Sequence, residues 1–156
     1  MSARSPQEVA HLAADTMWAN DPTSRELGME LVEIAPGRAV LAMTVAPHMT
    51  NGHDTAHGGF LFTLADSAFA FACNSYGDTT VAAHCSITFV RPGRRGDRLV
   101  ATAQEVSRSG RSGIYDVTIA REGVTIALFR GHSRTIGGSF IAPAENAPQS
   151  SDSEAS

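Results

Sequence analysis

The segment from Gly59 to about Tyr76 is the most hydrophobic part of the chain, and it constrains the fold more than any other feature. As a helix it carries apolar side chains on nearly every side, so it should be buried all round. Two glycines, Gly58 and Gly59, stand where this helix should begin, and one carboxylate, Asp66, stands in its middle. A buried carboxylate without a partner is costly, so Asp66 requires a partner, a cavity or a chemical role.

The composition excludes several classes of function. The chain has 156 residues, of which 42% are hydrophobic and 18% charged, and these values are typical of one globular domain. The net charge of −4 gives no sign of a nucleic-acid partner. All twelve basic residues are arginines, and the absence of lysine excludes Schiff-base chemistry.

Targeting and redox features favour the cytoplasm. The N-terminus lacks a basic segment followed by an apolar run, so no signal peptide is expected. The longest apolar run, residues 60–73, is too short to span a membrane. Cys73 and Cys85 lie in apolar segments and form no Cys-x-x-Cys pair, so we expect buried free thiols in a reducing compartment. We therefore expect a cytoplasmic protein that does not bind membranes.

Helical periodicity also appears at the N-terminus. Residues 5–20 predict an amphipathic helix with a serine N-cap and a capping box, and residues 22–27 predict a further turn of helix. Residues 1–28 are accordingly interpreted as an N-terminal helical segment of the same domain, and residues 29–138 as the main domain. Residues 139–156 are rich in Ala, Pro, Ser and acids, which is typical of a disordered tail.

Alternating apolar residues predict a sheet. One enclosed helix and about six strands together predict an α+β fold, in which a curved antiparallel sheet wraps around a long central helix. The expected strands, separated by Gly- and Pro-containing turns, are residues 29–34, 39–45, 79–90, 98–107, 113–121 and 124–136.

The glycine pair predicts a place where a ligand can approach the backbone. The first amides of a helix lack internal partners, and the helix dipole adds about half a positive charge there. Glycine lets a ligand come close, so the amide of Gly58 could hold a developing oxyanion. The alternative is a tight loop that only needs unusual backbone angles.

Asp66 is a candidate general base. Burial among apolar neighbours would raise its pKa towards neutrality, and the flanking Thr63 and Ser67 could donate hydrogen bonds to it. The alternative is a structural carboxylate that caps a neighbour or pairs with an arginine. Eight residues separate Asp66 from Gly58, a rise of about 12 Å, which is too far for one helix to place both around one carbon atom. A second copy would have to bring its own Asp66 to Gly58, so the spacing favours a dimer with shared sites.

Other constellations support weaker hypotheses. His53 and His57 are spaced like a helical zinc pair, but glycines on both sides favour a loop, and no third ligand stands out. No Gly-x-Ser-x-Gly motif predicts a serine nucleophile. Clusters of arginine at residues 91–98 and at Arg108 and Arg111 are typical of solvated surfaces, although they could bind phosphates. We expect no metal ion and no redox cofactor.

Several motifs, spread over about residues 10 to 138, together resemble one family. The order of elements resembles the hot-dog fold, and the motifs are similar to those of the PaaI-type phenylacetyl-CoA thioesterases. The matching segments are Asn51-Gly-His53, His57-Gly-Gly59, Leu64-Ala-Asp66, Asn74-Ser75, Phe89-Val-Arg-Pro-Gly93, Gly96-Asp97 and Phe129-Arg-Gly-His-Ser-Arg-Thr-Ile-Gly-Gly138.

The resemblance implies hydrolysis of an aryl-acetyl-CoA, of the phenylacetyl-CoA or hydroxyphenylacetyl-CoA type, as in phenylacetate catabolism. It implies that Asp66 activates water or attacks the thioester, that Gly58 polarises its carbonyl, and that Asn51 positions water or substrate. The other implied substrate contacts are at His57, Gly59, Ser67 and Arg111, of which Arg111 is the least securely matched.

The resemblance also implies a homotetramer, built as a dimer of dimers with sites shared between subunits. Two rival interpretations remain open. One is a hot-dog hydratase or dehydratase, which would need a catalytic histidine such as His57. The other is a non-catalytic acyl-CoA sensor, which would gain nothing from a carboxylate at position 66.

Overall fold

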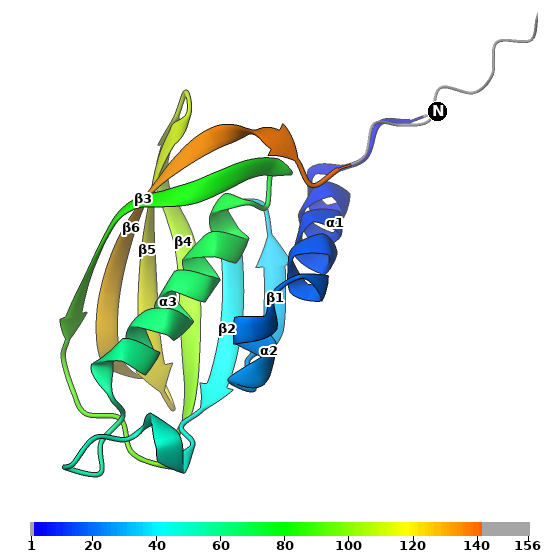
Figure 1. Cartoon of the computed structure of the whole chain (residues 1–156). Helices are drawn as coiled ribbons and strands as arrows, with labels where there is room; N and C mark the ends of the chain where they lie inside the picture. Colours follow the sequence, from blue (N-terminus) through cyan, green and yellow to red (C-terminus); the bar gives the residue numbers. More distant parts are fainter. Residues whose placement is uncertain (1, 142–156) are drawn as a thin grey trace, which may run out of the picture.

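A six-stranded antiparallel sheet curls around one long helix in the computed structural model of the chain (Figure 1). The structure describes residues 2–141, so residues 142–156 of the expected tail lie outside the described residues. The strand order is β1-β2-β4-β5-β6-β3, which makes β1 and β3 the two edges of the sheet. The predicted α+β architecture of the hot-dog type is confirmed.

The predicted elements are present, with ends that differ by up to three residues. The last strand extends furthest, because it continues through Ser139 and is followed by a hydrogen bond from the Phe140 amide to the Gly77 carbonyl (2.8 Å). The elements of residues 2–141 are α1 (Pro6–Ala19), α2 (Pro22–Glu26), β1 (Glu30–Ala35), β2 (Arg38–Thr44), the short 3-10 helix η1 (Pro47–Met49), α3 (Gly58–Cys73), β3 (Asp78–Phe89), β4 (Arg98–Ser109), β5 (Ser112–Arg121) and β6 (Val124–Ser139).

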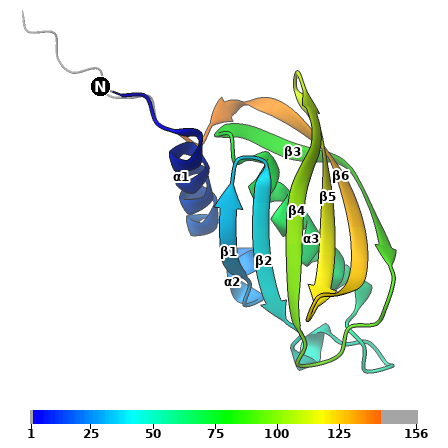
Figure 2. The ribbon, with the colours of Figure 1, turned by 180° about the vertical axis from the view of Figure 1, so that it is seen from behind.

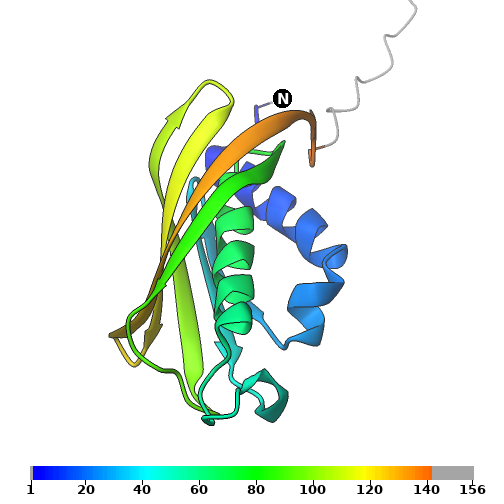
Figure 3. The same ribbon diagram turned by 60° about the vertical axis from the view of Figure 1, so that its left-hand side comes forward.

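The N-terminal helices lie on the same side of the sheet as α3 (Figure 3). The capping box predicted at the start of α1 is present, with Ser5 and Glu8 each accepting a backbone amide of the other. Trp18 of α1 packs against Phe71 of α3, with ring centroids 6.1 Å apart. These contacts cover part of the side of α3 that faces away from the sheet.

Close packing holds α3 against the sheet. The helix lies across β2, β4 and β5, and its buried side chains include Leu64, Phe69 and Phe71. Gly131 of β6 makes room for one of them, since a Cβ atom there would lie 2.7 Å from the Phe69 ring. Burial of such side chains contributes roughly 2 to 3 kcal/mol each, so this interface sets the position of the helix.

The expectation that α3 is enclosed on all sides is wrong for one stripe of the helix. Gly59 is exposed, and Thr63, Asp66 and Ala70 are only half-buried. These four residues, spaced three or four apart, share one face of the helix and are called the uncovered stripe below. A single sheet can cover only one side of a helix, and α1 and α2 do not extend over this stripe.

The outer edge of the sheet is long and open at β3, as Figure 2 shows from the side opposite to Figure 1. Most residues of β3 are exposed or half-buried along its whole length of 12 residues. Natural proteins rarely leave such an edge unprotected, because its unpaired amides and carbonyls can pair with another chain. The edge at β1 is shorter, at 6 residues, and carries an irregularity between Leu31 and Glu33.

Both cysteines are free thiols, but only one is buried as predicted. Cys73 lies in the core, and burial raises its pKa to about 12, so its thiol is not a nucleophile near neutral pH. Cys85 is half-buried because it lies on the edge strand β3. In residues 2–141 no helix is both long enough and apolar enough to cross a membrane.

Candidate active site

The N-terminus of α3 leaves one amide without a partner. His57 is the N-cap, and its Nδ1 accepts a hydrogen bond from the Gly59 amide (2.9 Å). The carbonyl of His57 accepts from the amides of Phe60 (3.0 Å) and Leu61 (3.4 Å). The amide of Gly58 donates to no acceptor within residues 2–141. Of the four amides that a helix start leaves free, Gly58 is thus the donor that remains for a ligand.

The hydrogen bond from Gly59 also defines the tautomer of the His57 ring. Its Nδ1 accepts a hydrogen bond from the Gly59 amide, so the ring hydrogen lies on Nε2. The predicted loop between positions 51 and 57 is confirmed, and His53 lies in a turn of that loop. His57 therefore serves the helix cap through one nitrogen, and this engagement weakens the hypothesis of a histidine catalyst.

Asn51 organises the loop that precedes the helix. Its Oδ1 accepts from the His53 amide (2.9 Å), the Thr55 amide (3.3 Å) and the Thr55 hydroxyl (3.1 Å). Three donors around one atom identify it as the oxygen, so the NH₂ group is the free end of the side chain. In this arrangement Asn51 can offer donors, but no acceptor, to a bound molecule.

Gly58 and Asn51 line one open groove of about 390 Å³ between the start of α3 and the end of β3. The amide of Ala56 donates to the Gly93 carbonyl (2.8 Å), which ties the two walls together. The lining is mainly apolar. The remaining lining residues are Thr55, Ala56, Leu61, Phe89, Val90, Arg91, Pro92 and Gly93.

Asp66 lies on the uncovered stripe and has no hydrogen bond or ion pair within residues 2–141. Burial raises the pKa of its carboxyl group above the ordinary value, as predicted. Burial, and after it the charge of Asp66, raises the pKa of Cys85 on β3. The structural alternative, a carboxylate that pairs with an arginine or caps a neighbour, finds no support in these contacts.

The two neighbours expected to donate to Asp66 do not do so. The Thr63 hydroxyl donates to the Gly59 carbonyl (2.8 Å). The Ser67 hydroxyl lies 3.3 Å from that of Ser24 in α2, and Ser24 donates its own proton to Asp21 (2.6 Å). Ser67 must therefore be the donor in its pair, and it holds α2 against α3 instead of serving the carboxylate.

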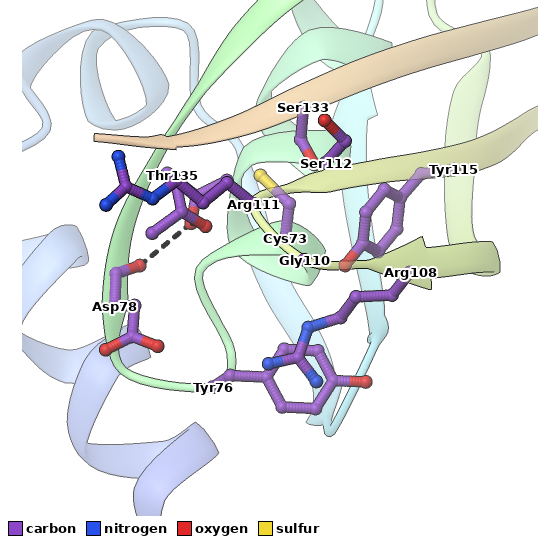
Figure 4. Close-up of a pocket in the computed structure, with 11 residues that line it drawn as sticks. Cys73, Tyr76, Asp78, Arg108, Gly110, Arg111, Ser112, Tyr115, Ser133 and Thr135 are labelled. Carbon is purple, nitrogen blue, oxygen red and sulfur yellow. Dashed lines mark hydrogen bonds between the residues drawn. The ribbon is translucent and has the colours of Figure 1, made fainter. Parts of the chain in front are cut away.

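The structure separates the predicted site residues into three places. Gly58, Asn51 and His57 come together at the helix start, whereas Asp66 is about 12 Å further along the helix axis. Arg111 lies between β4 and β5, beside the C-terminal end of α3, where it lines a small pocket with Cys73, Tyr76 and Arg108 (Figure 4). This pocket, of about 10 Å³, has room for one water molecule only.

The arginine cluster of residues 91–98 is largely engaged in local contacts. Arg95 pairs with Asp54 (2.7 Å), Arg98 pairs with Glu30 (3.0 Å), and Arg91 donates to a backbone carbonyl of β6. These arginines are exposed, and exposed ion pairs contribute little to stability. They agree better with a solvated surface than with a preformed phosphate site.

Of the groove lining, sequence reasoning identified only Asn51 and Gly58 as site residues, and among those it missed is Phe89. Its ring reaches the helix start, since a Cβ atom on Gly58 would lie 2.8 Å from its Cζ. Alternation along β3 places Cys85, Ile87 and Phe89 on one face of the strand. That alternation was visible in the sequence, but the face that meets the helix depends on how β3 pairs with β6.

Comparisons with known proteins agree with this architecture. Residues 53–127 match the family model described as Thioesterase superfamily. The acyl-coenzyme A thioesterase PaaI of Escherichia coli is 47% identical over 132 residues, which are 84% of this chain and 94% of that protein.

Solved structures extend the likeness. The E. coli PaaI protein from the phenylacetic acid degradation operon has a TM-score of 0.85 at 46% identity, over 86% of this chain and 99% of that one. A hypothetical thioesterase of Streptococcus pneumoniae, solved with coenzyme A, has a TM-score of 0.69 at 25% identity, over 72% of this chain and 91% of that one. The chain belongs to the thioesterase superfamily and, within it, to the family of PaaI thioesterases.

Proposed function

From this membership we propose that the chain hydrolyses an aryl-acetyl-CoA thioester, of the phenylacetyl-CoA or hydroxyphenylacetyl-CoA type, to the free acid and CoA. The observation that carries the proposal is the amide of Gly58, left without an acceptor at a helix N-terminus and facing an apolar groove. The E. coli relative, an acyl-coenzyme A thioesterase from a phenylacetic acid degradation operon, supports this substrate class.

The thioester carbonyl would accept its hydrogen bond from Gly58. As a nucleophile adds to the carbonyl carbon, negative charge moves onto the oxygen, where the amide and the positive end of the helix dipole stabilise it. One such donor contributes about 3 to 4 kcal/mol to the transition state. The free NH₂ group of Asn51 lies in the same groove and would orient the carbonyl or the attacking water.

Asp66 would activate the nucleophile. In one route its carboxylate takes a proton from water as the oxygen adds to the carbonyl carbon, and the tetrahedral intermediate then expels the CoA thiolate, which receives that proton. In the other route the carboxylate itself adds to the carbonyl and expels the thiolate, and water then hydrolyses the mixed anhydride. In both routes a carboxylate whose pKa is raised by its apolar surroundings is, once ionised, a stronger base or nucleophile.

Two copies of the chain would complete each site. The uncovered stripe and the open edge of β3 would both be covered by a second copy in which α3 runs antiparallel. That packing would bring the second copy's carboxylate to Gly58 and would remove the separation of about 12 Å. We propose that such dimers pair into a tetramer.

The same packing gives Arg111 a role. It lies near the C-terminal end of α3, about 24 Å from the start of that helix for 16 residues. In an antiparallel pair, each C-terminal end approaches the N-terminal end of the other helix. Arg111 would then contribute a guanidinium to a CoA phosphate at the site of the other copy.

The decisive experiment is steady-state hydrolysis of phenylacetyl-CoA, benzoyl-CoA and a fatty acyl-CoA by the wild type and by Asp66→Asn. The variant keeps the shape of the side chain and removes the base, so we expect a loss of at least about 100-fold in kcat on the aryl thioester. Undiminished turnover would exclude Asp66 as base or nucleophile. An active monomer in gel filtration would contradict the shared site.

A further inference from the structure

The outer end of the Phe89 ring lies against the start of α3. A Cβ atom built on Gly58 would lie 2.8 Å from Cζ of this ring and 3.3 Å from both Cε atoms. These distances place the Cβ position over one face of the ring, next to Cζ, so this face turns towards Gly58. The ring therefore fills the space where any side chain at position 58 would lie, and its opposite face remains available.

Phe89 is unusual among the phenylalanines around the core and the groove. Five others each pack against another aromatic ring within about 6 Å. Phe89 has no such partner within residues 2–141, and 52% of its surface is exposed. An exposed phenyl ring at the wall of an apolar groove gains free energy when an apolar group covers it. The five partnered residues are Phe60, Phe62, Phe69, Phe71 and Phe129.

The other apolar walls of the groove are aliphatic. Leu61, Val90 and Pro92 offer hydrophobic contact to any acyl group of suitable size, whether aromatic or straight-chain. A phenyl ring differs because it prefers another ring, in offset-stacked or edge-to-face geometry, beyond the gain from buried area alone. Phe89 is the only aromatic residue in this lining. It is therefore the group in the groove that can bind an aryl acyl group in preference to an alkyl one.

We propose that Phe89 determines the acyl specificity of this site by stacking against the aryl ring of the substrate. The inference rests on the proposed thioesterase function. When the thioester carbonyl accepts from the Gly58 amide, the aryl group of an aryl-acetyl thioester lies one methylene away from that carbonyl. The ring adjacent to Gly58 is then the first wall that the aryl group meets. An alkyl chain in the same place contacts the ring without the stacking preference.

The test compares two substrates on three proteins. We would measure kcat/KM for phenylacetyl-CoA and for hexanoyl-CoA with the wild type, with Phe89→Leu and with Leu128→Ala. Leucine keeps an apolar side chain and removes the ring faces. Leu128 is 49% exposed and lies beside the strand partner of Phe89, outside the groove lining, so it serves as the matched control.

The expected result is a change in preference. The ratio of kcat/KM for phenylacetyl-CoA to that for hexanoyl-CoA should fall about three- to tenfold in Phe89→Leu and stay at the wild-type value in Leu128→Ala. Thermal unfolding of each variant checks its fold. If Phe89→Leu does not fold, Phe89→Met should give the same fall in the ratio, because methionine is flexible and apolar and has no ring.

Two outcomes would overturn the inference. An unchanged ratio in an active Phe89→Leu enzyme would reject it, and an equal loss on both substrates would in that case assign the ring to shielding the helix end. This result leaves the proposed thioesterase function intact. A wild-type protein that hydrolyses neither thioester would reject the proposed function, and this inference with it.

Discussion

The two ends of α3 differ in how fully their polar groups are satisfied. At the C-terminal end, the Asn74 side chain accepts from the Thr80 amide (2.8 Å) and donates to the carbonyls of Thr80 and Ala70 (2.9 Å each). The Ser75 hydroxyl accepts from the Gly37 amide (2.8 Å) and donates to the Ala72 carbonyl (2.7 Å). At the N-terminal end, the Gly58 amide has no acceptor within residues 2–141.

A second network reinforces the C-terminal end. One carboxylate oxygen of Glu105 accepts from the hydroxyls of Tyr76 (3.0 Å) and Tyr115 (3.1 Å), and the Arg108 guanidinium lies 3.5 Å from the centre of the Tyr76 ring. Burial, followed by the nearby Glu105, raises the pKa of both tyrosines. Fully satisfied networks hold a fold in place, whereas unsatisfied groups in native proteins often mark function. The contrast predicts that mutations at the C-terminal end of α3 reduce stability and that mutations at its N-terminal end reduce activity.

The largest expected effect is on stability, at Asn74. Asn74→Ala would remove the buried side chain that bonds to the half-buried amide and carbonyl of Thr80, and we expect a loss of about 2 to 4 kcal/mol in the free energy of unfolding. Urea denaturation would measure it. Asn20→Ala is the control, because the side chain of Asn20 donates to a carbonyl at an exposed helix end. Equal losses in the two variants would contradict the contrast between buried and exposed networks.

The next effect is on activity, at Gly58. A methyl group there meets the tip of the Phe89 ring and crowds the approach of the thioester to the free amide. We expect Gly58→Ala to lower kcat/KM about 100-fold, or roughly 2.7 kcal/mol, with little change in stability, because the ring can swing aside. Gly52→Ala is the control in the same loop, since a Cβ atom at position 52 would meet nothing within 4 Å. Wild-type activity in Gly58→Ala would remove this amide from the mechanism.

A smaller effect is expected at the helix cap. His57→Ala removes the acceptor of the Gly59 amide and should cost about 1 kcal/mol of stability. His57→Asn can accept the same hydrogen bond, so it should recover most of that loss. Thermal unfolding of both variants distinguishes a cap from a side chain that serves only the substrate, for which the two variants would be equally stable.

The smallest effect is a gain in stability at Asp66. Burial raises the pKa of Asp66 in the folded state above its value in the unfolded state. Ionisation of this carboxyl group therefore lowers the free energy of unfolding as the pH rises through the raised pKa. At lower pH the group is protonated in both states, and this loss of stability disappears. Asp66→Asn should therefore raise the thermal midpoint at pH 7, and this gain should shrink as the pH falls. Asp15→Asn, at an exposed position of α1, is the control. A gain that is independent of pH would argue against desolvation as its cause.

Much of the fold follows from local patterns. The helices and the six strands were predicted within three residues, because turn residues and periodicity are local properties. The prediction that α3 is buried on all sides was wrong for one stripe of the helix. Apolar content alone did not show that one stripe, with Gly59, Thr63 and Asp66, lies beyond the reach of a single sheet.

The site was only partly predictable. Gly58 and Asn51 were identified from their motif, and the structure brings them to one groove. Phe89 could not be identified, because its contact with Gly58 depends on the register of β3 against β6, in which Phe89 opposes Ala127. Local sequence does not encode a pairing between strands that are about forty residues apart.

The sequence by itself determined that one apolar helix with a glycine start and a central carboxylate would lie in a curved antiparallel sheet, because periodicity and the cost of a buried charge are properties of the chain. Only the tertiary structure decided which polar groups remain unsatisfied. Whether the amide of Gly59 finds an acceptor depends on the turn of the His57 ring, and whether Asp66 finds a partner depends on what packs around α3. Such pairings are made in space, between groups whose distances the order of residues does not specify.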